Sequence, residues 1–246
     1  MAEHVLPADA GCSVLDHVPG RAHHHRAAKA LAATVEEGHE FWGWDGRTLG
    51  TPARTAAGIA AWLRLVAVPE DTACGKLWEG ARSAQHALGD LDGRRPALLG
   101  LHDATEDGTA YRAELSVRVE EPALSTDPIL NQDLDLPAQW WTDLAQTLAK
   151  LATTSTDRTA VRTQYMQRAI PQFLGIPAPH ALCWSTAHAD LHWANLTSPL
   201  RILDWEGWGA APAGFDAALL YAYSLRCPAP PPASARPSPP WAARTP

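Results

Sequence analysis

Cysteine is scarce in this chain, and its few copies are scattered. The 246 residues contain four cysteines, and no two of them form a CxxC pair. A disulfide framework or a zinc site of the cysteine type is therefore not expected. A reducing compartment such as the cytoplasm fits this cysteine usage better.

The sequence also lacks a long apolar run and an excess of positive charge. No stretch approaches the roughly 18 apolar residues of a membrane-spanning helix. Residues 1–14 lack the basic segment and apolar stretch of a secretory signal. The formal net charge is −7, whereas nucleic-acid binding needs a basic face. We therefore expect neither a membrane nor a nucleic acid as partner.

The chain does have the composition of a globular protein, with 46% apolar and 19% charged residues. Strand patterns dominate its first half and helical patterns its second half, which indicates an α+β fold with two lobes. We expect an N-terminal lobe over residues 1–121 and a C-terminal lobe over 122–226. Residues 227–246 are rich in proline and are predicted to be a disordered tail.

Periodicity and turn residues define the expected elements. In the first half they are a short helix at 23–33, strands at 42–49 and 59–68, a helix at 75–88, and a hairpin of 97–102 with 109–119 that turns at 106–108. In the second half they are helices at 137–151, 157–170 and 216–225, a turn-rich link at 171–179, and short strands at 182–184 and 201–203.

The most informative segment places three groups suited to Mg²⁺-dependent phosphoryl transfer within 15 residues. Asp190 can accept or orient a hydroxyl proton, while Asn195 and Asp204 offer the oxygen ligands that Mg²⁺ prefers. His188 belongs to the same catalytic loop and suits hydrogen bonding within it better than proton transfer. A second interpretation stays open, in which His188, Asp190 and His192 hold a transition metal for hydrolysis, because alternate residues of a strand share a face.

The pattern His188-Ala-Asp190-Leu-His192-Trp-Ala-Asn195, followed by Ile202-Leu-Asp204-Trp-Glu206, resembles the aminoglycoside phosphotransferase family. These are small-molecule kinases of protein-kinase-like fold. The resemblance implies that Asp190 is the catalytic base and that Asn195 and Asp204 bind the metal. It also implies an N-terminal antiparallel sheet lobe with one helix, and a mainly helical C-terminal lobe. Asp216 matches a family aspartate that usually tethers the catalytic loop.

The resemblance extends less specifically to the nucleotide site in the first half. Arg64 lies where the family's phosphate-binding strand would be, and Lys76 is a second candidate for that contact. Glu79, on the following helix, would be the ion-pair partner of one of them. The strand around Val117 corresponds to the hinge whose backbone would meet adenine.

The chain departs from the family pattern in three places. Ala189 replaces a common glycine, and Trp193-Ala194 replaces a Pro-Gly pair, so the loop backbone has less freedom to adopt a positive φ. No sharp glycine-rich phosphate loop is present, although Gly43, Gly46 and Gly50 are suggestive. Family members also continue with further helices after the position of Leu225, so we expect a truncated or frame-shifted member.

The function expected from the residues and the resemblance is transfer of the γ-phosphate of ATP (or GTP), with Mg²⁺, to a hydroxyl of a small polar molecule. The acceptor stays open, because similar kinases act on antibiotics, choline, homoserine and sugars. One alternative is a catalytically inactive, kinase-like nucleotide-binding protein, and the other is the metal-dependent hydrolase.

Overall fold

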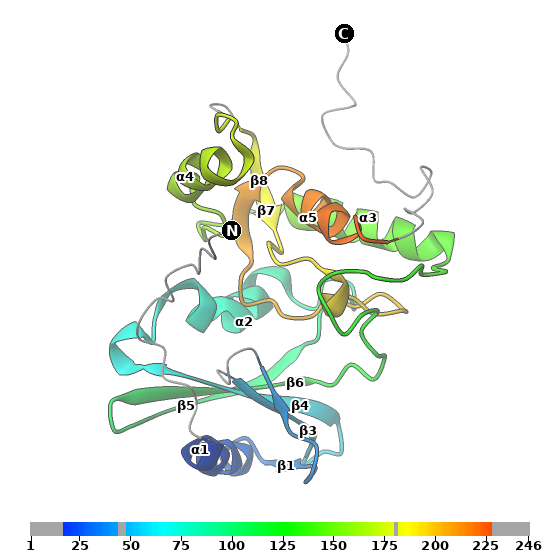
Figure 1. The fold of residues 1–246 in the computed structure, drawn as a ribbon. Coiled ribbons are helices and arrows are strands. Elements are labelled where there is room, and N and C mark those ends of the chain that lie inside the picture. Colours follow the sequence, from blue (N-terminus) through cyan, green and yellow to red (C-terminus); the bar gives the residue numbers. More distant parts are fainter. Residues whose placement is uncertain (1–16, 44–47, 180–181, 228–246) are drawn as a thin grey trace, which may run out of the picture. The chain divides into compact units, whose positions relative to one another are not determined.

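The computed structural model describes residues 17–43, 48–179 and 182–227, which form two compact units (Figure 1). One unit contains the described residues up to Trp78 together with Leu98–Arg118. The other contains Glu79–Ala97 and the described residues from Val119 onward. The predictions made for residues 1–14, for Gly46 and for the proline-rich tail beyond Cys227 lie outside the described residues.

The first unit is built around an antiparallel sheet with strand order β1-β3-β4-β6-β5, in which β2 pairs with β3. The strands are β1 (Ala33–Val35), β2 (Phe41–Trp42), β3 (Thr48–Thr55), β4 (Ala60–Pro69), β5 (Leu98–Glu106) and β6 (Thr109–Val117). Helix α1 (His17–Ala30) precedes the sheet and the 3-10 turn η2 (Glu70–Thr72) follows β4. Helix α2 (Gly75–Leu88) begins in this unit and ends in the other.

Alternation along β4 explains how the sheet is packed. Residues 61, 63, 65 and 67 are buried, while the residues between them are partly exposed. The buried face forms a cluster with Ala27 and Ala28 of α1. The predicted strand at 59–68 and helix at 75–88 are confirmed, as is the hairpin, which turns at Asp107 and Gly108 with positive φ at both. Helix α1 begins earlier than the predicted 23–33.

The burial of His24 under the sheet makes stability depend on pH. Its Nε2 lies 3.3 Å from the Leu63 carbonyl and 3.2 Å from the Thr51 hydroxyl. Burial is the main cause that lowers the pKa of His24, and the charge of His25 lowers it further, while the hydrogen bond to the Leu63 carbonyl and the charge of Glu40 act in the opposite direction. Below pH of about 6.5 the unfolded chain therefore binds a proton that the folded chain refuses. Stability is lost as pH falls from 6.5 toward the lowered pKa.

We expect His24→Gln to reduce the slope of unfolding free energy against pH in this window. A single group contributes at most about 1.4 kcal/mol per pH unit. The measurement is urea unfolding between pH 5 and 7.5, with the same change at the exposed His39 as control. A slope in the His24 variant that equals the wild-type slope would contradict the assignment.

The second unit is mainly helical. Its elements are the end of α2, α3 (Ala138–Ala152), α4 (Thr163–Leu174), β7 (Trp184–Ala187), the 3-10 turn η3 (Trp193–Asn195), β8 (Gly209–Pro212) and α5 (Phe215–Tyr223). Strands β7 and β8 form a two-stranded antiparallel sheet. One core cluster joins Ala84 of α2, Trp140 and Leu144 of α3, and Trp193 and Trp208 from the loops. The α+β class predicted from the sequence is confirmed.

Two predictions for the second unit are wrong in their bounds. The helix predicted at 157–170 begins only at Thr163, because residues 158–160 pair with β8. The Ala160 N–H donates to the Ala210 carbonyl at 3.0 Å, and the Ala210 N–H donates to the Arg158 carbonyl at 2.7 Å. The helix then continues through Pro171, where a turn-rich link was expected, and ends at Gly175 in a left-handed conformation.

The two short strands predicted around the motif also differ from the structure. Strand β7 lies at 184–187, two residues later than the predicted 182–184. The segment 201–203 forms no strand, although Ile202 makes an isolated antiparallel bridge with Leu196. The predicted helices at 137–151 and 216–225 correspond to α3 and α5 within two residues at each end.

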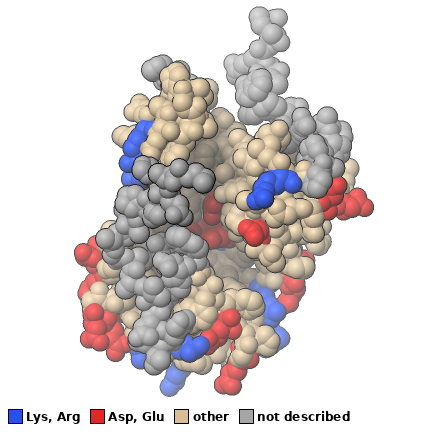
Figure 2. Space-filling view, viewed as in Figure 1, with Lys and Arg blue, Asp and Glu red and all other residues tan. Residues whose placement is uncertain are grey.

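Two properties of the surface bear on possible partners. Within the described ranges, no helix is both long and apolar enough to cross a membrane. On the face drawn in Figure 2, the basic side chains of the described residues form small separate groups, with acidic side chains among them. The charge on this face is therefore mixed.

Candidate functional site

The loop that follows β7 is fixed to α5 by a buried carboxylate. Asp216, in the first turn of α5, accepts the backbone N–H groups of His188 and Ala189, both at 2.8 Å. Asp216 is buried, with 6% of its surface exposed. Burial raises the pKa of Asp216, while the two N–H donors and His188 act in the opposite direction. The tethering role that the resemblance implies for Asp216 agrees with this geometry.

The imidazole of His188 is used entirely inside the loop. The residue is fully buried, and its ring meets Trp205 edge to face at a centroid distance of 4.7 Å. Its Nε2 lies 2.8 Å from the Leu203 carbonyl, which can only accept, so Nε2 carries the proton. Nδ1 then accepts the Asp190 backbone N–H at 3.3 Å. Since both nitrogens are engaged, this geometry favours a positioning role for His188 over proton transfer.

Ala189 adopts the positive φ that was expected to be difficult without glycine. Its φ is 67°, in the left-handed region where a β-carbon costs roughly 1–2 kcal/mol. The loop nevertheless holds this conformation, because the Ala189 N–H binds Asp216. Ala189 is therefore a strained residue immediately before the candidate base Asp190.

We expect Ala189→Gly to stabilise the folded chain by about 0.5–1 kcal/mol. Relief of the left-handed strain exceeds the conformational entropy that glycine adds to the unfolded chain. Urea unfolding measures the change. The control is Ala187→Gly in β7, where φ is not positive and where glycine should destabilise. A loss of stability in the Ala189 variant would show that the loop does not store this strain.

The three candidate groups, Asp190, Asn195 and Asp204, lie in one hydrogen-bonded loop, here called the turn of the candidate site. The Asn195 side-chain N–H donates to the Asp190 carbonyl at 3.0 Å, and the Leu203 N–H donates to the Asn195 carbonyl at 2.9 Å. Asp204 follows directly, with a φ of 55° and an exposed side chain. The Asp190 side chain is 51% exposed. Base and metal-ligand candidates that are 14 residues apart in sequence are thus held by the same short loop.

The donor set of this turn fits a hard divalent cation. It offers two carboxylates and one amide oxygen, the ligand chemistry that suits Mg²⁺. The amide N–H of Asn195 is bound to the Asp190 carbonyl, which leaves its oxygen for another partner. The two carboxylates also act together on His192: burial lowers the pKa of His192, and the charges of Asp190 and Asp204 oppose that shift.

The alternative metal triad of His188, Asp190 and His192 has weaker geometric support. Over the described part of the chain, no three His, Cys, Asp or Glu side chains are grouped so that they could hold a metal ion. His188 would have to give up both ring hydrogen bonds to become a ligand. His192 faces Asn195 through Nε2 at 3.2 Å, while its Nδ1 is buried without a hydrogen-bond partner in the described structure.

The turn after Asp204 is anchored to α2. The Trp208 indole N–H lies 3.2 Å from the Gly80 carbonyl and 3.1 Å from the Ser83 hydroxyl. A β-carbon at Gly80 would come within 2.3 Å of the Glu206 backbone, so only glycine permits this approach. Gly80, Trp208 and the nearby Arg158 have no local sequence signal that marks them as residues of the site.

The candidates for the nucleotide site divide between the two units. Arg64 of β4 lies opposite Glu114 of β6, and their side chains form an ion pair at 3.4 Å. Lys76 is exposed near the start of α2, and Val117 is the last residue of β6. Glu79 belongs to the other unit, where its charge acts on Arg158. The pairing of Glu79 with Arg64 or Lys76 stays a prediction.

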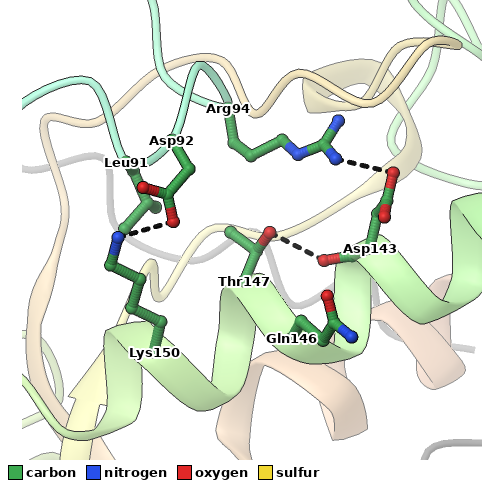
Figure 3. Close-up of a pocket in the computed structure, with 7 residues that line it drawn as sticks. All are labelled: Leu91, Asp92, Arg94, Asp143, Gln146, Thr147 and Lys150. Carbon is green, nitrogen blue, oxygen red and sulfur yellow. Dashed lines mark hydrogen bonds and ion pairs between the residues drawn. The ribbon is translucent and has the colours of Figure 1, made fainter.

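A polar pocket lies elsewhere in the second unit, between the loop after α2 and one face of α3 (Figure 3). Its volume is about 220 Å³. Arg94 pairs with Asp143 at 2.6 Å on one side, and Lys150 pairs with Asp92 at 2.5 Å on the other. None of the residues predicted for the site lines this pocket.

Comparison with known proteins supports the fold and leaves the family open. No family model matches the sequence, and no curated protein matches it. The solved structure of the amicoumacin kinase hAmiN, in complex with AMP-PNP, Ca²⁺ and Ami, is similar with a TM-score of 0.54 at 10% identity. The match covers 78% of this chain and 66% of that kinase, so the chain spans just under two thirds of its length.

Two further solved structures are similar at lower scores. A putative fructosamine-3-kinase from Thermobifida fusca has a TM-score of 0.44 at 16% identity, with 83% of this chain and 79% of that chain covered. The MAP kinase LmaMPK10 from Leishmania major has a TM-score of 0.37 at 12% identity, with 76% and 49% covered. The similarity to the kinase hAmiN shows that the chain has the protein-kinase-like fold expected from its sequence.

Proposed function

We propose that this chain is a small-molecule kinase, which transfers the γ-phosphate of ATP or GTP to a hydroxyl group of a small polar molecule. The observation that carries the proposal is the turn in which the Asn195 amide binds the Asp190 carbonyl and the Leu203 N–H binds Asn195. It holds a candidate base beside two metal-ligand candidates on a kinase-like fold. The kinase hAmiN, whose structure contains AMP-PNP and Ca²⁺, supports a nucleotide and a divalent cation as ligands.

Each residue of the turn has a defined task in this proposal. Asp190 accepts or orients the proton of the acceptor hydroxyl, which leaves the oxygen free to attack phosphorus. Asn195 and Asp204 would hold Mg²⁺. The metal, when bound, neutralises charge on the phosphate oxygens. His188 and Asp216 keep the loop in place, so that Asp190 needs little reorganisation in the transition state.

Most of the proposed nucleotide contacts belong to the first unit, and Glu79 of the second unit is the exception. Arg64 or Lys76 would bind the phosphates, with Glu79 as partner, and the backbone around Val117 would meet the adenine. Arg64 forms an ion pair with Glu114 of the neighbouring strand. The acceptor belongs to the broad class of small polar hydroxyl compounds, which includes aminoglycoside-like molecules.

The test is the thermal stability of the wild-type chain during titration with Mg·ATP, with Asp204→Asn as the site variant. Ligand at about 100 times its Kd should add about 2.7 kcal/mol to the wild type. Asp204→Asn should need much more ligand, whereas Asp92→Asn, which changes an exposed carboxylate outside the turn, should match the wild type.

The outcomes separate the candidate functions. Stabilisation followed by phosphate transfer in a screen of hydroxyl compounds supports the kinase. Stabilisation with no transfer to any compound supports the inactive nucleotide-binding protein. A folded wild type that Mg·ATP does not stabilise contradicts both, and stabilisation by Zn²⁺ or Mn²⁺ alone would favour the hydrolase.

A further inference from the structure

Arg158 lies in the extended segment beside β8, where the sequence pattern had indicated a helix. Its Nε donates to the Trp208 carbonyl at 3.1 Å, and its Nη2 donates to the Glu206 carbonyl at 3.2 Å. The guanidinium also lies over the Trp208 ring, 5.0 Å from its centroid. One planar side chain therefore binds both ends of the turn that follows the candidate metal ligand Asp204.

The backbone of Arg158 also takes part in the contact with β8. Its carbonyl accepts the Ala210 N–H at 2.7 Å. A β-carbon at Gly209 would come within 2.8 Å of the same carbonyl, so the segment and β8 are in close contact. Because the segment around Arg158 and β8 are bound to each other, the guanidinium reaches the turn after Asp204 from a defined position.

The charge of Arg158 strengthens its hydrogen bonds to the Trp208 and Glu206 carbonyls. Burial lowers the pKa of Arg158, and the charges of Glu79 and Asp157 act against that shift. Arginine stays protonated in proteins, so both carbonyls receive charge-assisted bonds. Lysine could not reproduce this arrangement, since it has neither the planar fork nor the same stacking on an aromatic ring.

Asp204 depends on this turn for its position. Its φ of 55° lies in the left-handed region, which aspartate adopts more readily than most residues, and contacts on both sides of Asp204 keep the backbone there. The segments before and after this residue are linked directly, because the Trp205 indole N–H donates to the Ile202 carbonyl at 2.7 Å, across Asp204. On the side after it, Arg158 and the contact of Trp208 with α2 hold the turn.

We propose that Arg158 is a positioning residue for Asp204, and that its two bonds to the turn set how tightly Asp204 holds the divalent cation. The inference rests on the proposed function, since it requires that Asp204 bind a metal. Groups beyond the direct ligands are known to orient the ligands and to change metal affinity about 10- to 100-fold. The charge of Glu79, on α2, also acts on Arg158.

The test compares ATP binding with and without Mg²⁺ in the full chain. The factor by which Mg²⁺ strengthens ATP binding reports the metal site, whereas ATP binding in EDTA does not. We expect Arg158→Met to reduce this factor about tenfold and to leave binding in EDTA nearly unchanged. Arg158→Lys, which keeps the charge but not the fork, should fall between the wild type and Arg158→Met.

Arg94→Met is the matched control. Arg94 is also a half-buried arginine of this unit, and its side chain donates to the Leu200 carbonyl and to Asp143, which both lie outside the turn after Asp204. Its variant should lose stability while keeping the Mg²⁺ factor of the wild type. Unfolding free energies measured without ligand show how much stability each variant loses.

The possible results are distinct. The positioning role is overturned if a folded Arg158→Met keeps the Mg²⁺ factor of the wild type. It is also overturned if Arg94→Met reduces the Mg²⁺ factor as much as Arg158→Met does. Both results leave the proposed function intact. If Arg158→Met does not fold, the comparison of Arg158→Lys with Arg94→Lys decides the matter in the same way. A wild type that does not bind Mg·ATP overturns the proposed function and this inference together.

Discussion

Asp190→Asn is expected to lower phosphate transfer about 10²- to 10⁴-fold, which is the usual contribution of a positioned general base. The amide keeps the size of the side chain but cannot accept the proton. The loop should survive, because its hydrogen bonds use the backbone N–H and carbonyl of Asp190 and not its carboxylate. ATP binding should therefore stay close to that of the wild type.

The measurement is the transfer rate at saturating ATP to an acceptor found in the screen, together with the Kd for Mg·ATP. Asp127→Asn provides the control, since Asp127 is an exposed carboxylate of the same unit. An Asp190→Asn variant that transfers phosphate at the wild-type rate would require another base. Lost nucleotide binding would instead place Asp190 among the groups that hold the metal.

Asp216→Ala is expected to destabilise the chain by about 2–6 kcal/mol. The carboxylate accepts the backbone N–H groups of His188 and Ala189 in a buried site. Each donor left without a partner costs roughly 1–3 kcal/mol. The strained φ of Ala189 also loses the contact that maintains it. Activity should fall along with stability, because Asp190 follows directly.

Urea unfolding of Asp216→Ala and Asp216→Asn measures this effect. The asparagine keeps one acceptor oxygen and should recover part of the loss. The control is Asp135→Ala, which removes an exposed carboxylate and should change the unfolding free energy by less than about 0.5 kcal/mol. A loss below about 1 kcal/mol in Asp216→Ala would mean that the two donors find other partners.

The elements that were correctly predicted from the sequence are those with a clear local period. Helix α2 was predicted residue by residue, because its apolar positions repeat on one face and glycines mark its ends. The hairpin of β5 and β6 was predicted because Asp107 and Gly108 suit a tight turn. Such signals lie within a few residues and need no knowledge of distant contacts.

The features that were missed depend on contacts between distant parts of the chain. Thr156 and Asp157 suit a helix start, yet residues 158–160 pair with β8, about 50 residues later. The role of Arg158 could not be inferred, because its partners are main-chain carbonyls that carry no side-chain signature. Ala189 adopts the conformation of glycine because Asp216 holds it there, which the local sequence cannot reveal.

The candidate base and metal ligands of the site could be predicted from the sequence, whereas the residues that hold them in place could not. Asp190, Asn195 and Asp204 were recognised because carboxylate and amide groups at that spacing have an evident chemistry. Gly80 was not, since a glycine within a helix gives no hint of what packs against it. Its importance lies in the Glu206 backbone, which leaves no room for a β-carbon.

The passage of α2 from one unit to the other has a consequence for how the chain is made. The stretch Glu79–Ala97 is synthesised before the first unit is complete at Arg118, but it belongs to the second unit. Its Ala84 and Leu91 pack with Trp140 and Leu144, which leave the ribosome later. These apolar side chains therefore lack their packing partners until α3 has been synthesised. For the same reason, no single cut in the chain separates the two units into fragments with intact cores.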